Sequence, residues 1–277
     1  MKPNPIAEDV FRAVCSDLSP AADARSADDP SWRIRRVEVA QIAAKLPERG
    51  VFLDVGCGYG FVPRYFHRLG FKVISTDYPA TGGASLQALI DLGIEGHYVN
   101  VGREPLPLAD GSVDVAFAGN VIEHLPHSPR PFMEDLRRVL KPGGFLVMDT
   151  KNAVDLKTRL KVLCGVHNWA PLKSFYHLDI NPHHHKEYTL RELGQLFELA
   201  GFGNVERIAF EFFFHFSLRK FRGVQAMGAK AGEHSEFGAG FNPWHPYEYL
   251  RLVCLLLTRL FPGLRSEIMV VGQKPVR

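Results

Sequence analysis

Three segments of the sequence gather residue types that bind ligands or move protons. One is the glycine-rich run Asp54-Val55-Gly56-Cys57-Gly58-Tyr59-Gly60, whose glycines let the backbone turn tightly and approach a ligand closely. Another is residues 120–127, NVIEHLPH, in which Glu123 and His124 are adjacent, and the third is residues 181–188, NPHHHKEY. Because imidazole titrates near neutral pH, the second segment predicts a proton-accepting side chain. The first predicts a small-molecule site.

Strands and helices alternate around these segments. Short apolar runs predict strands, and glycine or proline marks the ends of the helices between them. The expected strands are 51–55, 71–76, 96–101, 113–119 and 145–150, and the expected helices are 61–69, 84–92 and 131–140. This alternation is typical of right-handed βαβ units, in which helices cover both faces of a parallel sheet. Ligands bind at the carboxyl ends of such strands, where the glycine-rich run and the segment 120–127 both lie.

Further elements are expected on both sides of this alternating region. Before it, the pattern predicts helices at 6–18 and 32–46, the second capped by Ser31. After it, the expected elements are a helix at 153–164, a loop at 165–188, a helix at 189–200, strands at 204–216 and 267–272, an irregular stretch at 222–245 and an apolar helix at 246–261. An irregular stretch as long as 222–245 inside a domain is typical of a lid or a binding element.

Two ligands compete for the glycine-rich run. The dinucleotide fingerprint G-x-G-x-x-G needs a small residue at position 61, where the helix packs, but this chain has Phe61 and its third glycine comes one place early. The spacing D-x-G-x-G-x-G instead resembles motif I of the class I S-adenosylmethionine-dependent methyltransferases. Binding of NAD is the minority interpretation.

Later segments extend this resemblance. Asp77 stands 17 residues after Gly60 (77 − 60 = 17), where the family places an acid on the ribose hydroxyls. Asn100-Val101 and the following REPLPLADGSVDV resemble the family's D-L-x-x-x-P-L-P-F-x-D-G-S-F-D, with Asn100 where an Asp usually meets the adenine amino group. Residues 121–152 resemble its EHL-x-x-P and R-V-L-K-P-G-G motifs, and residues 186–202 resemble its late helix and the entry to the next strand.

The resemblance covers about residues 50–152 and 181–202, and it implies both a fold and a cofactor. The fold class is α/β: a Rossmann-like, doubly wound, mostly parallel sheet of seven strands, the last of them antiparallel. We expect one structural domain, with an N-terminal helical cover (1–48), a cofactor-binding core (49–152) and a remainder (153–277) that completes the sheet and carries an acceptor-binding lid. The implied cofactor is S-adenosylmethionine, and the residues implied to bind it are Asp54, Gly56, Cys57, Gly58, Gly60, Asp77, Tyr78, Asn100, Val101 and Asn120.

The loop after the fourth strand is the expected place of the chemistry. Methyl transfer to a hydroxyl or ammonium group requires removal of a proton, so His124 is our candidate general base and Glu123 a second catalytic candidate. In the alternative interpretation both side chains are structural and tie the loop to the sheet. The segment also resembles the E-x-x-E-H metal site of polyprenyl-benzoate O-methyltransferases, but Asn120 replaces the first acid, so no metal is expected.

Residues 181–188 resemble the N-P-Y-H-x-R-E-Y segment of methyltransferases from glycan and natural-product clusters. Its positions His184, Lys186 and Tyr188, together with His127, are therefore candidate substrate-binding residues. Anchoring of the loop is the alternative role for the segment. Three successive histidines in an extended chain alternate between two faces, which disfavours a metal site made of all three.

Composition narrows the class of protein further. The 33 Lys+Arg against 30 Asp+Glu leave a net charge of +3 without a dominant basic block, so no nucleic-acid partner is expected. The basic runs at 33–36 and 218–222 are expected to be solvated faces. Four widely spaced cysteines favour a reducing, cytoplasmic location. The apolar helix at 246–261 is expected in the core, with a peripheral contact to a membrane or a lipid-linked acceptor as the alternative.

The resemblance predicts an enzyme that methylates an oxygen of a sugar, a glycan or another small molecule. Two alternatives stay open. One is methylation at nitrogen or carbon of a small molecule or natural product, and the other is a non-catalytic partner subunit that binds the cofactor.

Overall fold

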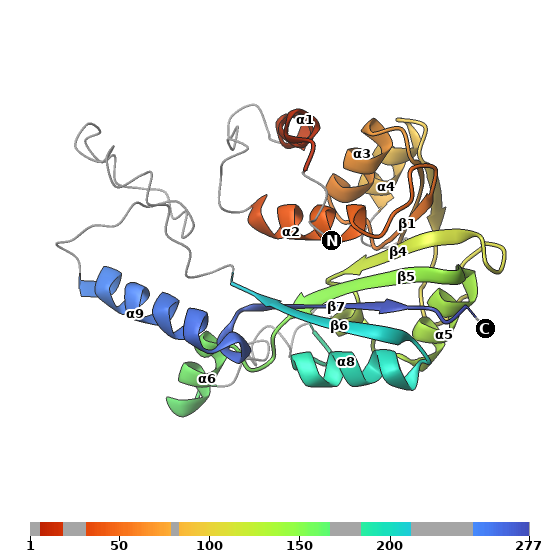
Figure 1. The fold of residues 1–277 in the computed structure, drawn as a ribbon. Helices are drawn as coiled ribbons and strands as arrows, with labels where there is room; N and C mark the ends of the chain where they lie inside the picture. Colours follow the sequence, from red (N-terminus) through yellow and green to blue (C-terminus); the bar gives the residue numbers. More distant parts are fainter. Residues whose placement is uncertain (1–5, 19–31, 79–82, 167–183, 212–245, 277) are drawn as a thin grey trace.

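A seven-stranded sheet lies at the centre of the protein, seen in a computed structural model (Figure 1). The structure describes residues 6–18, 32–78, 83–166, 184–211 and 246–276. Across the described sheet the strands run in the order β3-β2-β1-β4-β5-β7-β6. Their bounds are β1 (Val51–Val55), β2 (Lys72–Asp77), β3 (Glu95–Tyr98), β4 (Val113–Gly119), β5 (Leu140–Lys151), β6 (Gly203–Phe210) and β7 (Glu267–Gln273).

The strand directions confirm the predicted fold class. Strands β1 to β5 pair in parallel, whereas β7 runs antiparallel to both of its neighbours, β5 and β6. The strand order reverses at β1, because β2 lies on one side of it and β4 on the other. The loops that follow β1 and β4 therefore leave the same edge of the sheet in different directions, which opens a crevice between them.

Helices cover both faces of the sheet (Figure 1). One face carries α1 (Glu8–Leu18), α2 (Arg33–Ala43), α3 (Phe61–Arg68) and α4 (Gly83–Ile90), and the other carries α5 (Arg130–Val139) and α8 (Leu190–Leu199). Successive strand residues point to opposite faces. Phe52 and Val115 accordingly pack in the first core, while Leu53 and Ala116 pack in the second. Strands β1 and β4 are thus held from both sides.

Several helix boundaries differ by a few residues from the predicted ones, and two of these differences concern the signals that predicted them. Helix α2 begins after Trp32, whose side chain makes no capping hydrogen bond, and the predicted cap Ser31 lies outside the described residues. Helix α5 ends at Val139 and β5 begins directly with Leu140, so the expected stop signal Pro142-Gly143-Gly144 lies inside the strand. The pairing of β4 with β5 shifts register there, and the left-handed φ of 81° at Gly143 accommodates this bulge.

The last third of the chain is described only in part. Helix α6 (Leu156–Leu163) is capped by Asp155, and α8 starts with a capping box formed by Thr189 and Glu192. The predicted irregular stretch at 222–245 and the basic run at 218–222 lie outside the described residues, as does the part of the predicted strand 204–216 that follows Glu211.

Helix α9 (Pro246–Leu260) is exposed along much of its described surface. Cys254 and Thr258 are buried, but Leu252, Leu256 and Leu260 are exposed. The helix projects beyond the end of the sheet in Figure 1, and the short helix η4 (Pro262–Leu264) follows it before β7. The expectation of core packing is therefore wrong for these leucines. No helix in the described ranges is long and apolar enough to cross a membrane.

Candidate functional site

The glycine-rich run forms the turn between β1 and α3. Gly56, Gly58 and Gly60 all have left-handed φ angles, of 76°, 51° and 76°, which residues with a side chain rarely adopt. A Cβ atom at Gly56 would also lie 2.5 Å from Cγ2 of Val121, in the loop after β4. Glycine at position 56 therefore allows the loops after β1 and β4 to approach each other.

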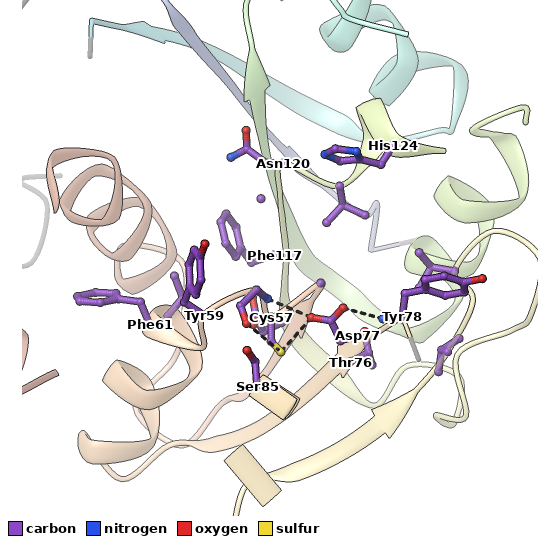
Figure 2. A pocket seen from close by; sticks show the side chains of 18 of the residues that line it. Cys57, Tyr59, Phe61, Thr76, Asp77, Tyr78, Ser85, Phe117, Asn120 and His124 are labelled. Carbon is purple, nitrogen blue, oxygen red and sulfur yellow. Dashed lines mark hydrogen bonds between the residues drawn. The ribbon is translucent and has the colours of Figure 1, made fainter. Parts of the chain in front are cut away.

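The end of β2 holds this turn in place. The carbonyl oxygen of Thr76 accepts hydrogen bonds from the backbone N–H groups of Gly56 and Cys57, at 2.9 and 3.0 Å. Oδ2 of Asp77 accepts from the Gly58 N–H and from the Cys57 thiol, both at 3.1 Å, and Oδ1 accepts from the next backbone N–H (Figure 2). A carboxylate has about four acceptor positions. Asp77 therefore fixes the loop and keeps capacity for a ligand.

A cavity of about 1310 Å³ opens between this turn and the loops after β3 and β4. In Figure 2, Asn120 and His124 lie on the other side of this cavity from Asp77. Among the residues predicted to bind the cofactor, only Gly60 does not line the cavity; it faces Leu89 of α4 instead. The other predicted residues all line it: Asp54, Gly56, Cys57, Gly58, Asp77, Tyr78, Asn100, Val101 and Asn120.

Helix α2 supplies a wall of the cavity that sequence reasoning missed. Trp32 and Arg35 line the cavity, and Nη1 of Arg35 lies 2.8 and 2.6 Å from the two carboxylate oxygens of the fully buried Glu38. The expectation that the segment 33–36 forms a solvated face is therefore wrong for Arg35. The available signal was the i, i+3 spacing of Arg35 and Glu38, which places opposite charges on one side of a helix.

Two further buried acids interact electrostatically with Arg35. Burial raises the pKa of Asp54 to about 8, although the positive charge of Arg35 opposes this shift. Burial and the neighbouring Glu38 carboxyl raise the pKa of Asp149 well above its ordinary value. Oδ2 of each Asp has no hydrogen-bond partner among the described residues. This end of the site is therefore suited to a positively charged group.

The loop after β4 forms the opposite wall. Asn120 adopts a left-handed φ of 53°, and its backbone N–H donates to the carbonyl oxygen of Asp149 at 2.9 Å. The short helix η2 (Ile122–His124) follows, and His124 lines the cavity. Glu123 is fully buried behind it, and burial raises its pKa. The two adjacent residues therefore have different surroundings, one at the cavity and one inside the protein.

The segment 184–188 folds back onto this loop. The backbone N–H of His185 donates to the carbonyl oxygen of Glu123 at 2.7 Å. The rings of His124 and His184 meet edge to face, with centroids 4.9 Å apart and an interplanar angle of 86°. Two histidines that are 60 residues apart in sequence (184 − 124 = 60) thus become neighbours.

The predicted substrate-binding residues make anchoring contacts. His127 lies against Gly102, Nζ of Lys186 lies 3.1 Å from Oε1 of Glu192, and the ring of Tyr188 is buried beneath Lys186. Acceptor binding by the four candidates stays a prediction, because none of them lines the cavity. They are His127, His184, Lys186 and Tyr188. His185, which the sequence did not single out, does line it, while residues 181–183 lie outside the described ranges.

Known proteins show the same core. Residues 53–148 match the family model of a methyltransferase domain. A probable S-adenosylmethionine-dependent methyltransferase of Mycolicibacterium smegmatis is 31% identical over 178 residues, which cover 64% of this chain and 61% of the relative. The match thus spans about three fifths of that relative's length.

Solved structures share the fold at low sequence identity. An S-adenosylmethionine-dependent methyltransferase from Archaeoglobus fulgidus superposes with a TM-score of 0.55 at 16% identity, covering 87% of this chain and 94% of the other. A phosphoethanolamine N-methyltransferase of Haemonchus contortus, solved with phosphomonomethylethanolamine and S-adenosylhomocysteine, gives a TM-score of 0.55 at 14% identity, covering 97% of this chain and 57% of the other. Sequence match, strand order and glycine-rich turn agree, and the chain carries a class I S-adenosylmethionine-dependent methyltransferase domain.

Proposed function

We propose that this protein transfers a methyl group from S-adenosylmethionine to an oxygen atom of a sugar, a glycan or another small molecule. The observation that carries the proposal is the position of His124. Its imidazole lines the cavity at the carboxyl end of β4, across from the glycine-rich turn and Asp77. A proton acceptor at this place can serve an acceptor hydroxyl that enters from the open side of the cavity.

The methionine end of the cofactor fits the charges near α2. S-adenosylmethionine carries an ammonium group and a sulfonium group, and the buried acids Asp54 and Asp149 each leave one carboxylate oxygen without a partner. We assign the ammonium group to Asp54 with Asn120 nearby, and the cofactor carboxylate to the guanidinium of Arg35. These pairings compensate buried charge that the described protein groups leave in part uncompensated.

The adenosine end fits the other side of the cavity. Asp77 has acceptor capacity beyond its contacts with the glycine-rich turn, which suits the two adjacent ribose hydroxyls. The Asn100 amide oxygen can accept a hydrogen bond from the adenine amino group, without the negative charge that an Asp would bring. Tyr78 and Val101 line the same part of the cavity and supply apolar contact.

The chemistry divides between the cofactor and the chain. When bound, the cofactor supplies an electrophilic methyl carbon, whose bond to sulfur breaks on transfer to give S-adenosylhomocysteine. The chain holds the acceptor in line with that carbon and, through His124, removes the hydroxyl proton as the new carbon–oxygen bond forms. Positioning accounts for much of the rate in such a reaction.

Specific observations also support two alternative functions. Methylation at nitrogen or carbon uses the same cofactor site, and the phosphoethanolamine N-methyltransferase of H. contortus shares this fold. A cofactor-binding partner subunit without turnover would need only the turn and Asp77. The exposed leucines of α9 support a lipid-linked or membrane-surface acceptor as one version of the main proposal.

A labelled-cofactor screen tests the proposal. The protein is incubated with S-adenosylmethionine labelled in its methyl group and with matched panels of sugars, glycans and phenols on one side and amines on the other. We expect label to pass to hydroxyl acceptors and to be lost with His124→Ala. Transfer only to amines supports the nitrogen alternative and contradicts the proposal. Cofactor binding with no transfer to any acceptor of either panel also counts against it.

A further inference from the structure

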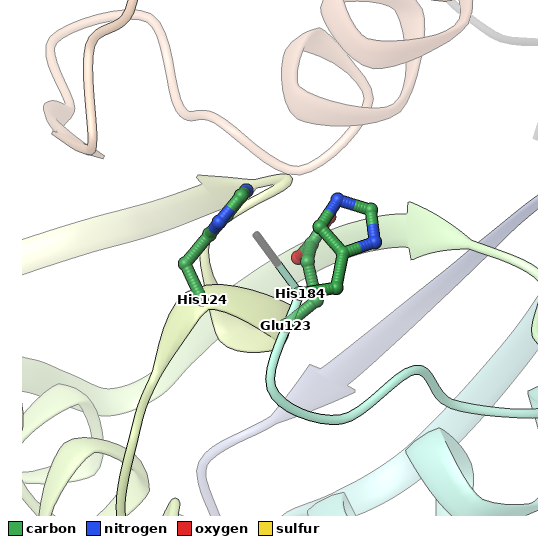
Figure 3. A group of neighbouring side chains, drawn as sticks. All are labelled: Glu123, His124 and His184. Carbon is green, nitrogen blue, oxygen red and sulfur yellow. The ribbon is translucent and has the colours of Figure 1, made fainter. Parts of the chain in front are cut away.

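Glu123, His124 and His184 form a cluster of metal-binding side chains at the edge of the cavity. Figure 3 shows the side chains of Glu123 and His184 together, with the ring of His124 beside them; the first and the last come from η2 and His184 from the segment 184–188. One ligand atom from each residue lies within 4.8 Å of the other two. Zinc ligands lie about 2.0–2.2 Å from the ion and hence roughly 3.5 Å from one another, so small side-chain rotations close the cluster around an ion.

The buried Glu123 carboxyl is the second, independent observation. Its side chain is fully buried, and neither of its oxygens has a hydrogen-bond partner among the described residues. A buried carboxylate without a donor or a cation is costly. A divalent cation between Glu123 and the two imidazoles supplies the missing partner.

The surroundings of His184 are those of a metal ligand. Its Nδ1 lies 3.0 Å from Oε1 of Glu187, and a proton on Nδ1 leaves the lone pair of Nε2 for an ion. Such a carboxylate–histidine pair behind a metal is the usual arrangement that fixes the ring and its tautomer. The hydrogen bond from the His185 N–H to the Glu123 carbonyl holds this backbone beside η2.

We propose that Glu123, His124 and His184 bind one divalent transition-metal ion of the zinc class. Two imidazoles and one carboxylate are a donor set that such ions favour, and three protein ligands leave a coordination position open. Because His124 lines the cavity, an ion bound to it would lie at the edge of the space assigned to the acceptor. The ion's role there, to polarise an acceptor oxygen instead of having His124 accept its proton, rests on the proposed function, whereas the binding of the ion does not.

The departure from the sequence-based expectation has a simple cause. That expectation considered Glu123 and His124 with Asn120, and considered the three successive histidines as a group of their own. The fold instead takes one histidine, His184, from that run and places it beside Glu123.

Zinc titration of the chelator-treated full chain tests the site without any acceptor. We expect one zinc ion per chain by calorimetry and elemental analysis. Glu123→Gln and His184→Asn should each weaken binding at least a hundredfold, and Glu187→Gln ten- to a hundredfold, since it removes only the partner of a ligand. His185→Ala is the matched control: it removes the neighbouring histidine of the same run and should leave zinc affinity unchanged.

Thermal unfolding of the same proteins separates metal binding from folding. Zinc should raise the melting temperature of the unsubstituted chain and of His185→Ala fully, that of Glu187→Gln less, and those of Glu123→Gln and His184→Asn little. Without zinc, Glu123→Gln should melt no lower than the unsubstituted chain, because it replaces an unpaired buried carboxylate by a neutral amide. If Glu123→Gln fails to fold, the zinc affinity and melting temperature of His184→Asn test the same site, because His184 lies in the segment 184–188 and not in η2.

Two results overturn the inference: no stoichiometric zinc in the unsubstituted chain at micromolar concentration, or equal zinc affinity in Glu123→Gln and His184→Asn. Calorimetry with S-adenosylmethionine on the same samples keeps this failure distinct from a failure of the proposed function. Cofactor binding without zinc binding rejects the metal site alone.

Discussion

The two sides of the cavity are built in different ways. On the cofactor side, a continuous run after β1 forms the turn, and Asp77, the last residue of the adjacent strand β2, holds it through two hydrogen bonds. On the acceptor side, η2 after β4 meets a segment that comes 60 residues later in the chain (184 − 124 = 60). The first side is therefore a local structure, and the second exists only once the chain has folded.

This difference predicts that changes on the two sides separate cofactor binding from turnover. Substitutions on the cofactor side should weaken binding of S-adenosylmethionine, and substitutions on the acceptor side should leave that binding intact. Five predictions test this comparison, and those with the strongest expected effects come first.

His124→Ala should lower turnover about 10²- to 10⁴-fold, the usual contribution of a positioned proton acceptor, without changing cofactor affinity. The measurement is methyl transfer from labelled cofactor to an acceptor found in the screen, with calorimetry for the affinity. His67→Ala, on α3, is the control and should retain both. Unchanged turnover in His124→Ala would show that His124 is not the general base, and it would contradict the assignment of this side of the cavity to the acceptor.

Cofactor affinity should rise with pH up to about 8. Burial raises the pKa of Asp54 to about 8, so at lower pH its carboxyl is neutral and must lose a proton before it pairs with the cofactor's ammonium group. Each pH unit below the pKa then weakens binding up to about tenfold. Calorimetry at pH 6, 7 and 8 checks this slope. Asp54→Asn should flatten it, and an equally steep slope in that variant contradicts the assignment.

The same pKa has a consequence for the stability of the ligand-free protein. The folded state keeps a proton on Asp54 that the unfolded state loses above its ordinary pKa of 3.8. The free energy of unfolding should therefore fall as pH rises between about 4 and 8. Chemical denaturation across this range measures the trend, and Asp54→Asn should reduce it.

Asp77→Ala should weaken S-adenosylmethionine binding about ten- to a hundredfold, because it removes a charged acceptor and releases the Gly58 N–H. Glu95→Gln, on the neighbouring strand β3 and exposed, is the matched control and should bind as the unsubstituted chain does. Equal affinity in the two variants means that the ribose is held elsewhere.

Thr189→Ala should destabilise the protein by about 1 kcal/mol, the typical loss on removing a helix cap, with cofactor affinity unchanged. Thr158→Ala, within α6, keeps its helix cap because Asp155 provides it, and should be close to neutral. Urea unfolding of both variants gives the comparison. A loss of cofactor affinity in Thr189→Ala breaks the separation between the two sides.

The cofactor side was predictable because its determinants are close together in sequence. A strand, three glycines and an acid at the end of the next strand specify the turn before any long-range packing is known. The exception was Arg35, whose position at the cavity depends on how α2 packs against α3 and the sheet. The periodicity of a helix predicts on which side of the helix a residue lies, but it does not predict how far that residue lies from a ligand.

The acceptor side was only partly predictable for a related reason. The sequence marked both 120–127 and 181–188, yet their contact depends on the bridge between Tyr188 and Asn152 and on the hydrogen bond from His185 to Glu123. Neither contact can be predicted from the spacing of these residues along the chain. The buried, unpartnered state of Glu123 likewise follows from tertiary packing alone.

Calorimetric titration of the full chain with S-adenosylmethionine at pH 8 is the decisive measurement for the cofactor site. We expect one cofactor per chain, weaker binding in Asp77→Ala and unchanged binding in His124→Ala. The absence of binding at millimolar cofactor in a folded protein would contradict the assignment of this cavity and the proposed activity with it.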